Sequence, residues 1–262
     1  MFWSTVLGWY YQVLAAKLGV ATQRNLAQNC REQFTPKSKY TLWIMTELAI
    51  IGSDMQEVVG SATAIAILTG WSLQVGAVIT ILDSFLFLFI HYYGVRKLEF
   101  FFLLLIGIMT VTFCANMITS EPNYGEIAIG LVVPRVPKGS LNAMLGLVGA
   151  VIMPHNLYLH SALVLSRKVN YRNRNAVAEG NYYNAVESAI SLGVSFFINT
   201  FVIATFAVYV INNKDNAVDT DLNLTSAAAA LEVNFGTPAK YIWAIGLLAA
   251  GQSSTMTGTY AG

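Results

Sequence analysis

Apolar residues along this chain fall into seven long runs that are separated by polar stretches. The runs lie at roughly 2–22, 41–68, 72–93, 98–118, 140–166, 183–211 and 239–258. Each is near the length of about 20 residues that an α-helix needs to cross the hydrocarbon core of a bilayer. The pattern therefore predicts an all-α, polytopic membrane protein with about seven spans. No low-complexity segment or short repeat divides it, so residues 1–262 are expected to form a single transmembrane domain.

The composition supports a membrane protein over a soluble one. Charged residues make up 11% of the chain and hydrophobic residues 55%, and the mean hydropathy is +0.55. A soluble domain carries about a quarter charged residues. The net charge of +1 gives no indication of nucleic-acid binding, because the basic residues are scattered among the loops, and no nucleic-acid partner is expected. The two cysteines offer no disulfide framework.

Basic residues are distributed unevenly between the two sides of the predicted membrane domain. If the first run crosses toward the cytoplasm, the outer side holds only four of the 15 Lys and Arg residues, namely Arg135, Lys138, Lys214 and Lys240. The positive-inside rule then places the connections 23–40 and 167–182 in the cytoplasm. The chain would begin on the outside, which predicts a preceding span. Asn223, in an Asn-Leu-Thr triplet on the outer side, becomes a candidate N-glycosylation acceptor.

Pro154 interrupts the apolar run at 140–166. Proline has no N–H, and its ring clashes with the carbonyl four residues earlier, here that of Ala150. A helix that reaches Pro154 must break or kink, and the Ala150 carbonyl then loses its usual partner. In lipid such backbone is tolerated only where it is buried in protein or lines a cavity. Secondary transporters commonly build substrate and ion sites at such breaks.

Met153 lies directly before this proline and three residues after Ala150, so its thioether and the Ala150 carbonyl can face one point. A carbonyl oxygen alone suits hard cations, whereas an added thioether favours softer transition metals. The alternative is that Met153 merely fills a core and Pro154 merely kinks a helix. Polar neighbours at His155, Asn156 and His160 favour the site, because polar groups at membrane depth usually mark a pathway.

Three carboxylates share one stripe of the run at 41–68. At 100° per residue, Asp54 lies about 20° and Glu57 about 80° from Glu47. Their neighbours are apolar, so the stripe is expected to face a polar interior rather than solvent. Burial disfavours the charged form of a carboxylate and allows it to exchange protons near neutral pH. With His155 and His160, these acids would form a proton relay.

Two further acids, Asp83 and Glu187, also lie inside apolar runs. For both we expect a structural pairing with a neighbouring polar side chain rather than a place in the relay.

Several stretches resemble the NRAMP (natural resistance-associated macrophage protein) family of divalent metal transporters. Residues 153–156, Met-Pro-His-Asn, resemble the signature of the family's sixth helix, and residues 52–58, Gly-Ser-Asp-Met-Gln-Glu-Val, resemble its third. Residues 251–262 are similar to the motif near the end of the eighth helix. Residues 93–99, Tyr-Gly-Val-Arg-Lys-Leu-Glu, resemble the connection before the fifth. The resemblance covers nearly the whole chain, in family order.

The resemblance implies a LeuT-like inverted-repeat transporter fold with broken first and sixth helices. It also implies coupled transport of protons and divalent metals such as manganese and ferrous iron, which are substrates, so no cofactor is expected. The implied metal ligands are the Met153 sulfur and the Ala150 carbonyl. The implied proton-route residues are His155 and Glu57, with Asp54, His160 and Glu47 as supporting positions. A multi-pass protein of the plasma membrane or of an endosomal or vacuolar membrane is expected.

One part of the family's pattern is missing. The other metal ligands of the family lie in an Asp-Pro-Gly-Asn motif on the first broken helix, and that motif does not occur here. The expected fold is therefore incomplete, running from about the second helix to the eighth. A partial sequence, a truncated gene product or a splice product would each explain this.

Three other functions compete with metal transport. An amino-acid transporter of the same fold would give no reason for Met153 beside Pro154. A membrane metalloenzyme is disfavoured because His155 and His160 are five residues apart, and not four as in His-Glu-x-x-His. A non-transporting fragment that regulates full-length subunits is compatible with the missing motif.

Overall fold

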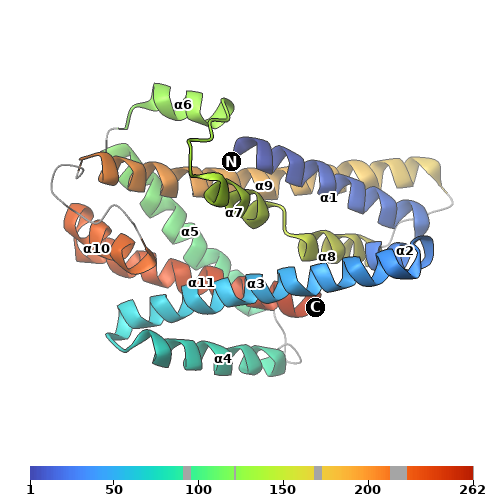
Figure 1. Cartoon of the computed structure of the whole chain (residues 1–262), viewed down its shortest axis with the longest axis horizontal. Coiled ribbons are helices and arrows are strands. Elements are labelled where there is room, and N and C mark those ends of the chain that lie inside the picture. The colour runs from blue at the N-terminus through green and yellow to red at the C-terminus, as the bar shows by residue number, and fades with distance from the viewer. Residues whose placement is uncertain (91–95, 121, 168–172, 213–222, 262) are drawn as a thin grey trace. The chain divides into compact units, whose positions relative to one another are not determined.

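The computed structural model describes residues 1–90, 96–120, 122–167, 173–212 and 223–261, and every regular element in these ranges is an α-helix (Figure 1). The predicted all-α class is confirmed. In chain order the helices are α1 (Phe2–Thr22), α2 (Leu26–Gln33), α3 (Pro36–Thr69), α4 (Leu73–Ile90), α5 (Arg96–Thr119), α6 (Tyr124–Val132), α7 (Leu141–Val151), α8 (Pro154–Leu165), α9 (Arg174–Asn212), α10 (Leu224–Phe235) and α11 (Thr237–Ala261).

Each of the seven apolar runs falls on one helix or, at 140–166, on the pair α7 and α8, but two of these helices begin five or more residues before their runs. Helix α3 starts at Pro36 and α9 at Arg174, five and nine residues before the predicted starts. At 1.5 Å per residue the two helices are about 51 and 58 Å long, well beyond a hydrocarbon core of about 30 Å. Hydropathy detects only the part of a helix that lies in lipid, so it missed the polar first turns.

Two helical stretches are long and apolar enough to cross a membrane by length and composition, judged on the described residues. They are 141–165, which combines α7 and α8, and 174–211 in α9. A third appears if α3 and the first part of α4, which meet at a bend of 119°, are taken as one broken span. The number of seven spans stays a prediction.

The chain divides into two compact units. The first contains residues 1–51, 124–197 and 260–262, and the second contains 52–123 and 198–259. Helices α3 and α9 contribute residues to both units.

In the first unit, α1 packs on α8 through small residues. Its buried positions include Ser4, Gly8, Ala15, Ala16 and Gly19. A Cβ atom at Gly19 would lie 3.0 Å from the Ser161 carbonyl oxygen of α8. Larger side chains would force the two backbones apart, which is why small residues line helix interfaces in membranes.

Indole groups fasten α1 to two other helices of this unit. Trp3 donates a hydrogen bond to the Val132 carbonyl at the end of α6 (2.9 Å). Trp9 donates one to the Ala185 carbonyl in α9 (3.0 Å). Both acceptors are backbone carbonyls, so α1 is held to α6 and α9 without any dependence on the side chains there.

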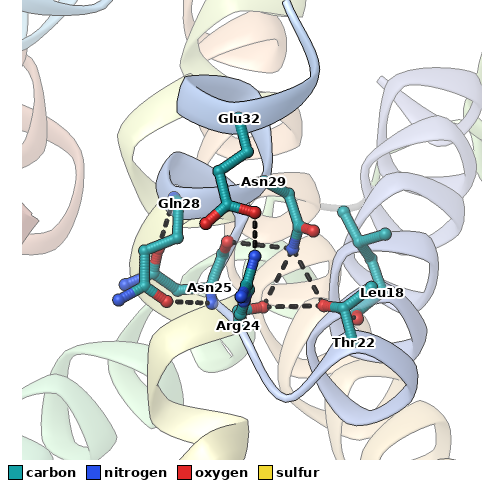
Figure 2. Close-up of polar contacts among 7 residues, drawn as sticks. All are labelled: Leu18, Thr22, Arg24, Asn25, Gln28, Asn29 and Glu32. Atoms are coloured by element: carbon teal, nitrogen blue, oxygen red, sulfur yellow. Dashed lines mark hydrogen bonds and ion pairs between the residues drawn. The ribbon is translucent and has the colours of Figure 1, made fainter.

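A polar network shapes the turn from α1 into α2 (Figure 2). Asn25 caps α2: its side chain accepts from the Gln28 N–H (2.8 Å), and the Gln28 side chain accepts from the Asn25 N–H (3.0 Å). Such a capping box satisfies two of the free N–H groups at a helix start. Arg24 forms an ion pair with Glu32 at the other end of α2. The eight-residue helix is thus fixed at both ends.

In the second unit, an aromatic cluster joins α5, α9 and α11. The Phe113 ring lies 5.3 Å from the Trp243 ring, and Phe206 lies 5.5 Å from Trp243. Both pairs are edge-to-face, the geometry that aromatic rings prefer. Leu231 of α10, which is 2% exposed, belongs to the same core.

Close contacts between small residues also hold α3, α4 and α11 together. Gly70 joins α3 to α4 with φ +76°, the left-handed conformation that glycine adopts without strain. A Cβ atom at Gly76 would lie 2.6 Å from the Ala62 carbonyl oxygen. At Gly251 of α11, a Cβ atom would overlap the Ser61 hydroxyl. Residues 69–72 thus form a tight connection between α3 and α4, whereas residues 93–97, part of the stretch that resembles the connection before the family's fifth helix, lie partly outside the described residues.

Candidate functional site

The predicted break at Met153-Pro154 is present and has defined geometry. Helix α7 ends at Val151, with Ile152 (φ −103°, ψ 79°) as its last partly bonded residue. Met153 is extended (φ −83°, ψ 118°) and acts as the N-cap of α8. Pro154 takes the first position of α8, where its missing N–H costs no helical hydrogen bond. The break therefore lies two residues after Ala150, as the proline rule predicts.

The break brings together helix-end carbonyls and a sulfur atom. The last N–H bonded into α7 is that of Ile152, which donates to the Val148 carbonyl (2.9 Å). Pro154 has no N–H to donate to Ala150. The carboxyl end of a helix carries partial negative charge, which favours cations. Both predicted metal ligands, Ala150 and Met153, flank this end.

The Met153 thioether is held by a neighbour that the sequence did not single out as a ligand. The Asn156 side-chain amide lies 3.3 Å from the Met153 sulfur and donates to it. Sulfur is a weak acceptor and keeps a second lone pair for a metal ion. This contact restricts a flexible side chain and fixes the direction of its donor atom.

The two histidines of α8 occupy different faces of that helix. They are five residues apart, which places them about 140° apart around the helix. His155 lies in the first turn and is 4% exposed. His160 is half-buried, and its Nε2 lies 3.3 Å from the Ser188 hydroxyl of α9. The histidines therefore do not converge on one point, and only His155 is adjacent to the break.

The three acids of the predicted stripe differ in their surroundings. Asp54 is exposed, whereas Glu47 and Glu57 are half-buried. Glu57 accepts a hydrogen bond from the Ser53 hydroxyl one turn earlier (3.3 Å). Glu47 belongs to the first unit and lines a cavity together with Tyr158 of α8. Asp54 and Glu57 belong to the second unit, so a relay from them to the histidines stays a prediction.

The two acids expected to make structural pairs do so. Asp83 of α4 accepts a hydrogen bond from the Gln252 amide of α11 (2.8 Å). Glu187 of α9 forms an ion pair with Arg167. Within the ranges that the structure describes, no three His, Cys, Asp or Glu side chains are grouped closely enough to hold a metal ion.

Helix α9 carries polar residues that the sequence reasoning missed. Asn181, Asn184 and Ser188 follow one another at spacings of three and four, and Asn184 and Ser188 are buried at 2% and 3% exposure. The signal was available, because it is the same helical spacing that marked the acids of α3. Gln252 was quoted only as part of a motif, and nothing in the sequence alone pointed to Asp83 as its partner.

The candidate glycosylation residue has a structural role as the N-cap of α10. The Asn223 side-chain oxygen accepts hydrogen bonds from the Thr225 and Ser226 N–H groups (3.0 and 2.8 Å). The residue is exposed. Its use as an N-glycosylation acceptor stays a prediction.

Apolar helices, one of them interrupted by a proline beside polar side chains, are the architecture of a multi-pass membrane transporter. The sequence model of the family described as natural resistance-associated macrophage protein-like matches residues 1–262. The chain therefore belongs to the Nramp family, as its motifs predicted.

Relatives across the whole chain carry transporter names. A metal transporter nramp1 homolog of Dictyostelium discoideum is 47% identical over 264 residues, covering 100% of this chain and 49% of the relative. The metal transporter Nramp2 of Oryza sativa subsp. japonica is 48% identical, covering 100% and 50%. Protein Malvolio of Drosophila melanogaster is 46% identical, covering 100% and 49%. The chain spans about half the length of these relatives, and it belongs with transporters rather than enzymes.

Solved structures agree with the fold. A crystal structure of the Eremococcus coleocola manganese transporter, in complex with an aromatic bis-isothiourea substituted compound, matches with a TM-score of 0.76 at 33% identity. The match covers 98% of this chain and 56% of that one. A mutant of the same transporter matches equally well at 32% identity. The predicted transporter fold is confirmed.

Proposed function

We propose that this chain carries the metal-holding part of a proton-coupled transporter for divalent transition metals, such as manganese and ferrous iron. The observation that carries the proposal is the Met153 thioether at the break between α7 and α8, oriented by the Asn156 amide. The metal ion and the protons are substrates, and no resident cofactor enters the proposal.

The break supplies what a transition-metal ion needs at the midpoint of a membrane. The carboxyl end of α7 offers carbonyl oxygens and partial negative charge. The Met153 sulfur adds a soft donor, which calcium and magnesium do not favour. Selectivity thus follows from the identity of one side chain placed beside a backbone ligand.

Two neutral ligands do not complete such a site. Removing water from a doubly charged ion is severely unfavourable unless charged groups compensate. By its resemblance to the family, the full site draws a carboxylate and an amide from an Asp-Pro-Gly-Asn motif. The Ala150 carbonyl and Met153 sulfur then discriminate among ions, and the carboxylate supplies the neutralising charge.

The proton route is proposed to use His155 and Glu57, supported by Asp54, His160 and Glu47. Among side chains, only histidine has an ordinary pKa that changes its charge between about pH 5 and 8. His155 is buried in the first turn of α8, next in sequence to the proposed metal ligands, which supports this role. Metal binding and proton release at adjacent groups couple the two substrates, because a bound metal ion makes it less favourable for a nearby group to carry a proton, and a bound proton makes metal binding less favourable. The plasma membrane or an endosomal or vacuolar membrane is the proposed location.

Replacing the sulfur while keeping the volume tests the metal site. In a protein that joins this chain to the remaining helices of its relatives, Met153→Leu should raise the manganese concentration needed for half-maximal uptake. We expect at least about a tenfold rise, the cost typical of losing even an outer partner of a metal site. Calcium should then compete more strongly, because the soft donor is gone. Radioactive manganese uptake with and without calcium measures both effects.

Met45→Leu is the matched control. Met45 lies in α3 and is 62% exposed, so its replacement should leave manganese uptake and calcium competition unchanged. If Met153→Leu discriminates against calcium as well as the parent protein does, the sulfur is not a ligand and the proposed site is wrong.

A further inference from the structure

A cavity of about 490 Å³ opens between α2, the first turns of α3, and α8, entirely within the first unit. Arg31 of α2 and Lys39 of α3 line it, together with Trp43, Thr46, Glu47 and Tyr158. It is separate from the break, because neither Met153 nor Ala150 borders it. Its lining combines positive charge, hydroxyl groups and apolar surface.

The two basic side chains of this cavity have no carboxylate partner among the residues that the structure describes. Glu32 is the nearest acid along α2, but Arg24 occupies it in an ion pair (Figure 2). In the part of the chain that the structure describes, neither Arg31 nor Lys39 takes part in an ion pair. Lys39 instead lies over the Tyr40 ring, 5.2 Å from its centre. Two basic groups are thus available to an anion from outside the protein.

Glu47 limits the charge that the cavity can accept. It is eight residues after Lys39, about 12 Å further along α3. The charged side chains of the lining are Arg31, Lys39 and Glu47, which at their ordinary ionisation sum to one net positive charge. A singly charged anion, such as a phosphodiester, matches this balance better than a phosphate monoester with nearly two negative charges.

The remaining lining residues suit a lipid more than a small soluble anion. Trp43 is 58% exposed, and tryptophan is enriched where a helix leaves the bilayer core. Leu42 continues the apolar wall. Deeper in, the Tyr158 hydroxyl lies beside the Thr46 hydroxyl and the Cys30 thiol. Hydroxyl groups could bind the polar part of a head group while the wall contacts its acyl chains.

We propose that this cavity binds the phosphodiester head group of an anionic phospholipid in the cytoplasmic leaflet. The excess of basic residues at 23–40 places the cavity on the cytoplasmic side, where anionic lipids are enriched. Basic pockets between helices on that side are suited to such head groups. Tyr158 is one helical turn after Pro154, so a bound lipid contacts the same half-helix that begins at the break.

Lipid retention by the purified chain tests the proposal. The purified chain is mixed in detergent with equal amounts of phosphatidylglycerol and phosphatidylcholine that have identical acyl chains. The detergent is then removed in a native mass spectrometer, and the lipid that stays bound is counted. We expect preferential retention of phosphatidylglycerol. The double variant Arg31→Gln, Lys39→Gln should weaken its binding about 25-fold, because each basic residue near a membrane surface contributes about fivefold in affinity.

Lys17→Gln with Lys37→Gln is the matched control, because it removes the same charge from the same side. Both residues are exposed and neither lines the cavity, so phosphatidylglycerol binding should change by less than about twofold. Ala27→Trp is a second test that alters no charge. Ala27 lines the cavity, and a bulky side chain there should block the lipid even with both basic residues present.

Three results would overturn the proposal. An equal loss of phosphatidylglycerol binding in the cavity double variant and in the control double variant would mean that the lipid is held by general attraction to basic residues and not by this cavity. Equal retention of phosphatidylcholine and phosphatidylglycerol would remove the role of charge. Complete displacement of the lipid by excess inorganic phosphate would identify a site for soluble anions instead. Circular dichroism of each variant checks that the helices are intact, and the Ala27→Trp result decides the question if the double variant does not fold.

Discussion

The side chain of Glu57 combines partial burial with a hydrogen bond from Ser53. A buried carboxylate is costly when charged and costly when it loses its partners. Such a group changes its protonation when the surrounding charge changes, which is what a proton-coupled carrier requires. The amide of glutamine keeps the shape and the acceptor oxygen of this side chain but cannot titrate.

Glu57→Gln should therefore separate proton flux from metal uptake. In the extended protein we expect metal-driven acidification to fall about a hundredfold, the lower end of the range for losing a positioned proton-transfer group, while metal uptake falls less. A pH-sensitive dye and radioactive manganese measure the two fluxes in the same vesicles. Ser53→Ala removes only the hydrogen bond and serves as the control. Unchanged acidification in Glu57→Gln would assign the residue a structural role.

At the scale of single residues, the sequence predicted the backbone correctly where the residue type restricts its conformation strongly. Proline cannot continue a helix, so Pro154 placed the break correctly, whereas the ligand roles of Ala150 and Met153 stay predictions. The partners of side chains were not predictable in the same way. Asn156 contacts Met153 because α8 begins with a particular turn, and Ser188 meets His160 only because α9 packs on α8. Such contacts depend on how helices pack, and one sequence does not encode that in its local pattern.

The contact between α11 and α3 is set by a glycine. Gly251→Ala should destabilise the second unit, because the added methyl group would overlap the hydroxyl of Ser61, which is fully buried. Overpacking of this kind costs about 1–3 kcal/mol. Thermal unfolding in detergent measures the loss.

The double variant Gly251→Ala, Ser61→Ala should recover most of that stability. The overlapping atom is then gone, and the Ser61 Cβ would be 3.5 Å away, an ordinary contact. Gly107→Ala is the control for helix propensity. No atom lies within 4 Å of its would-be methyl group, so this change should stabilise by about 0.5–1 kcal/mol. No recovery in the double variant would show that the helices are not in this close contact.

The corner between α10 and α11 contains a pH-dependent contact. Lys240 donates a hydrogen bond to Glu232 (2.7 Å), and this bond, together with the lysine charge, lowers the pKa of the Glu232 carboxyl below its ordinary value. A carboxyl with a lowered folded-state pKa stabilises the fold above its ordinary pKa of about 4.3. That contribution is lost as the pH falls through the lowered value.

Amide exchange of α10 should accordingly speed up between about pH 4.3 and the lowered pKa, beyond the intrinsic effect of pH on exchange. The change should be small, because the pair is only partly shielded from solvent. Lys240→Gln should abolish this additional pH dependence of amide exchange in α10. The exchange of α5 should be the same in the variant and in the parent protein. Identical profiles in the parent and the variant would mean that the contact does not form in solution.

At the scale of the whole molecule, the distribution of basic residues makes a prediction about sidedness. In a Cys30→Ser background, Thr225→Cys should react with an impermeant thiol reagent added from the outer or lumenal side. Ser38→Cys should react only after the membrane is permeabilised. Both positions are exposed, and the Thr225 change also removes the glycosylation triplet, so no glycan shields the new thiol. The opposite labelling pattern would invert the assignment of cytoplasmic and outer loops.

The fold class was predictable from sequence because lipid restricts backbone to helices or closed barrels, and the apolar runs have helical length. The full extents of α3 and α9 were not, since their first turns are polar and lie beyond the apolar runs. Short helices such as α2 and α6 depend on caps and packing partners, which the averaged pattern does not resolve.

The missing N–H of Pro154 also acts as protection against self-inhibition. Any other residue at position 154 would present an amide proton to the Ala150 carbonyl, four residues earlier. That proton would compete with the metal ion for the same lone pair, and it would be present at all times at a very high local concentration. If the Ala150 carbonyl binds the metal ion as proposed, proline keeps that backbone oxygen available to the substrate by removing the competitor from the covalent structure itself.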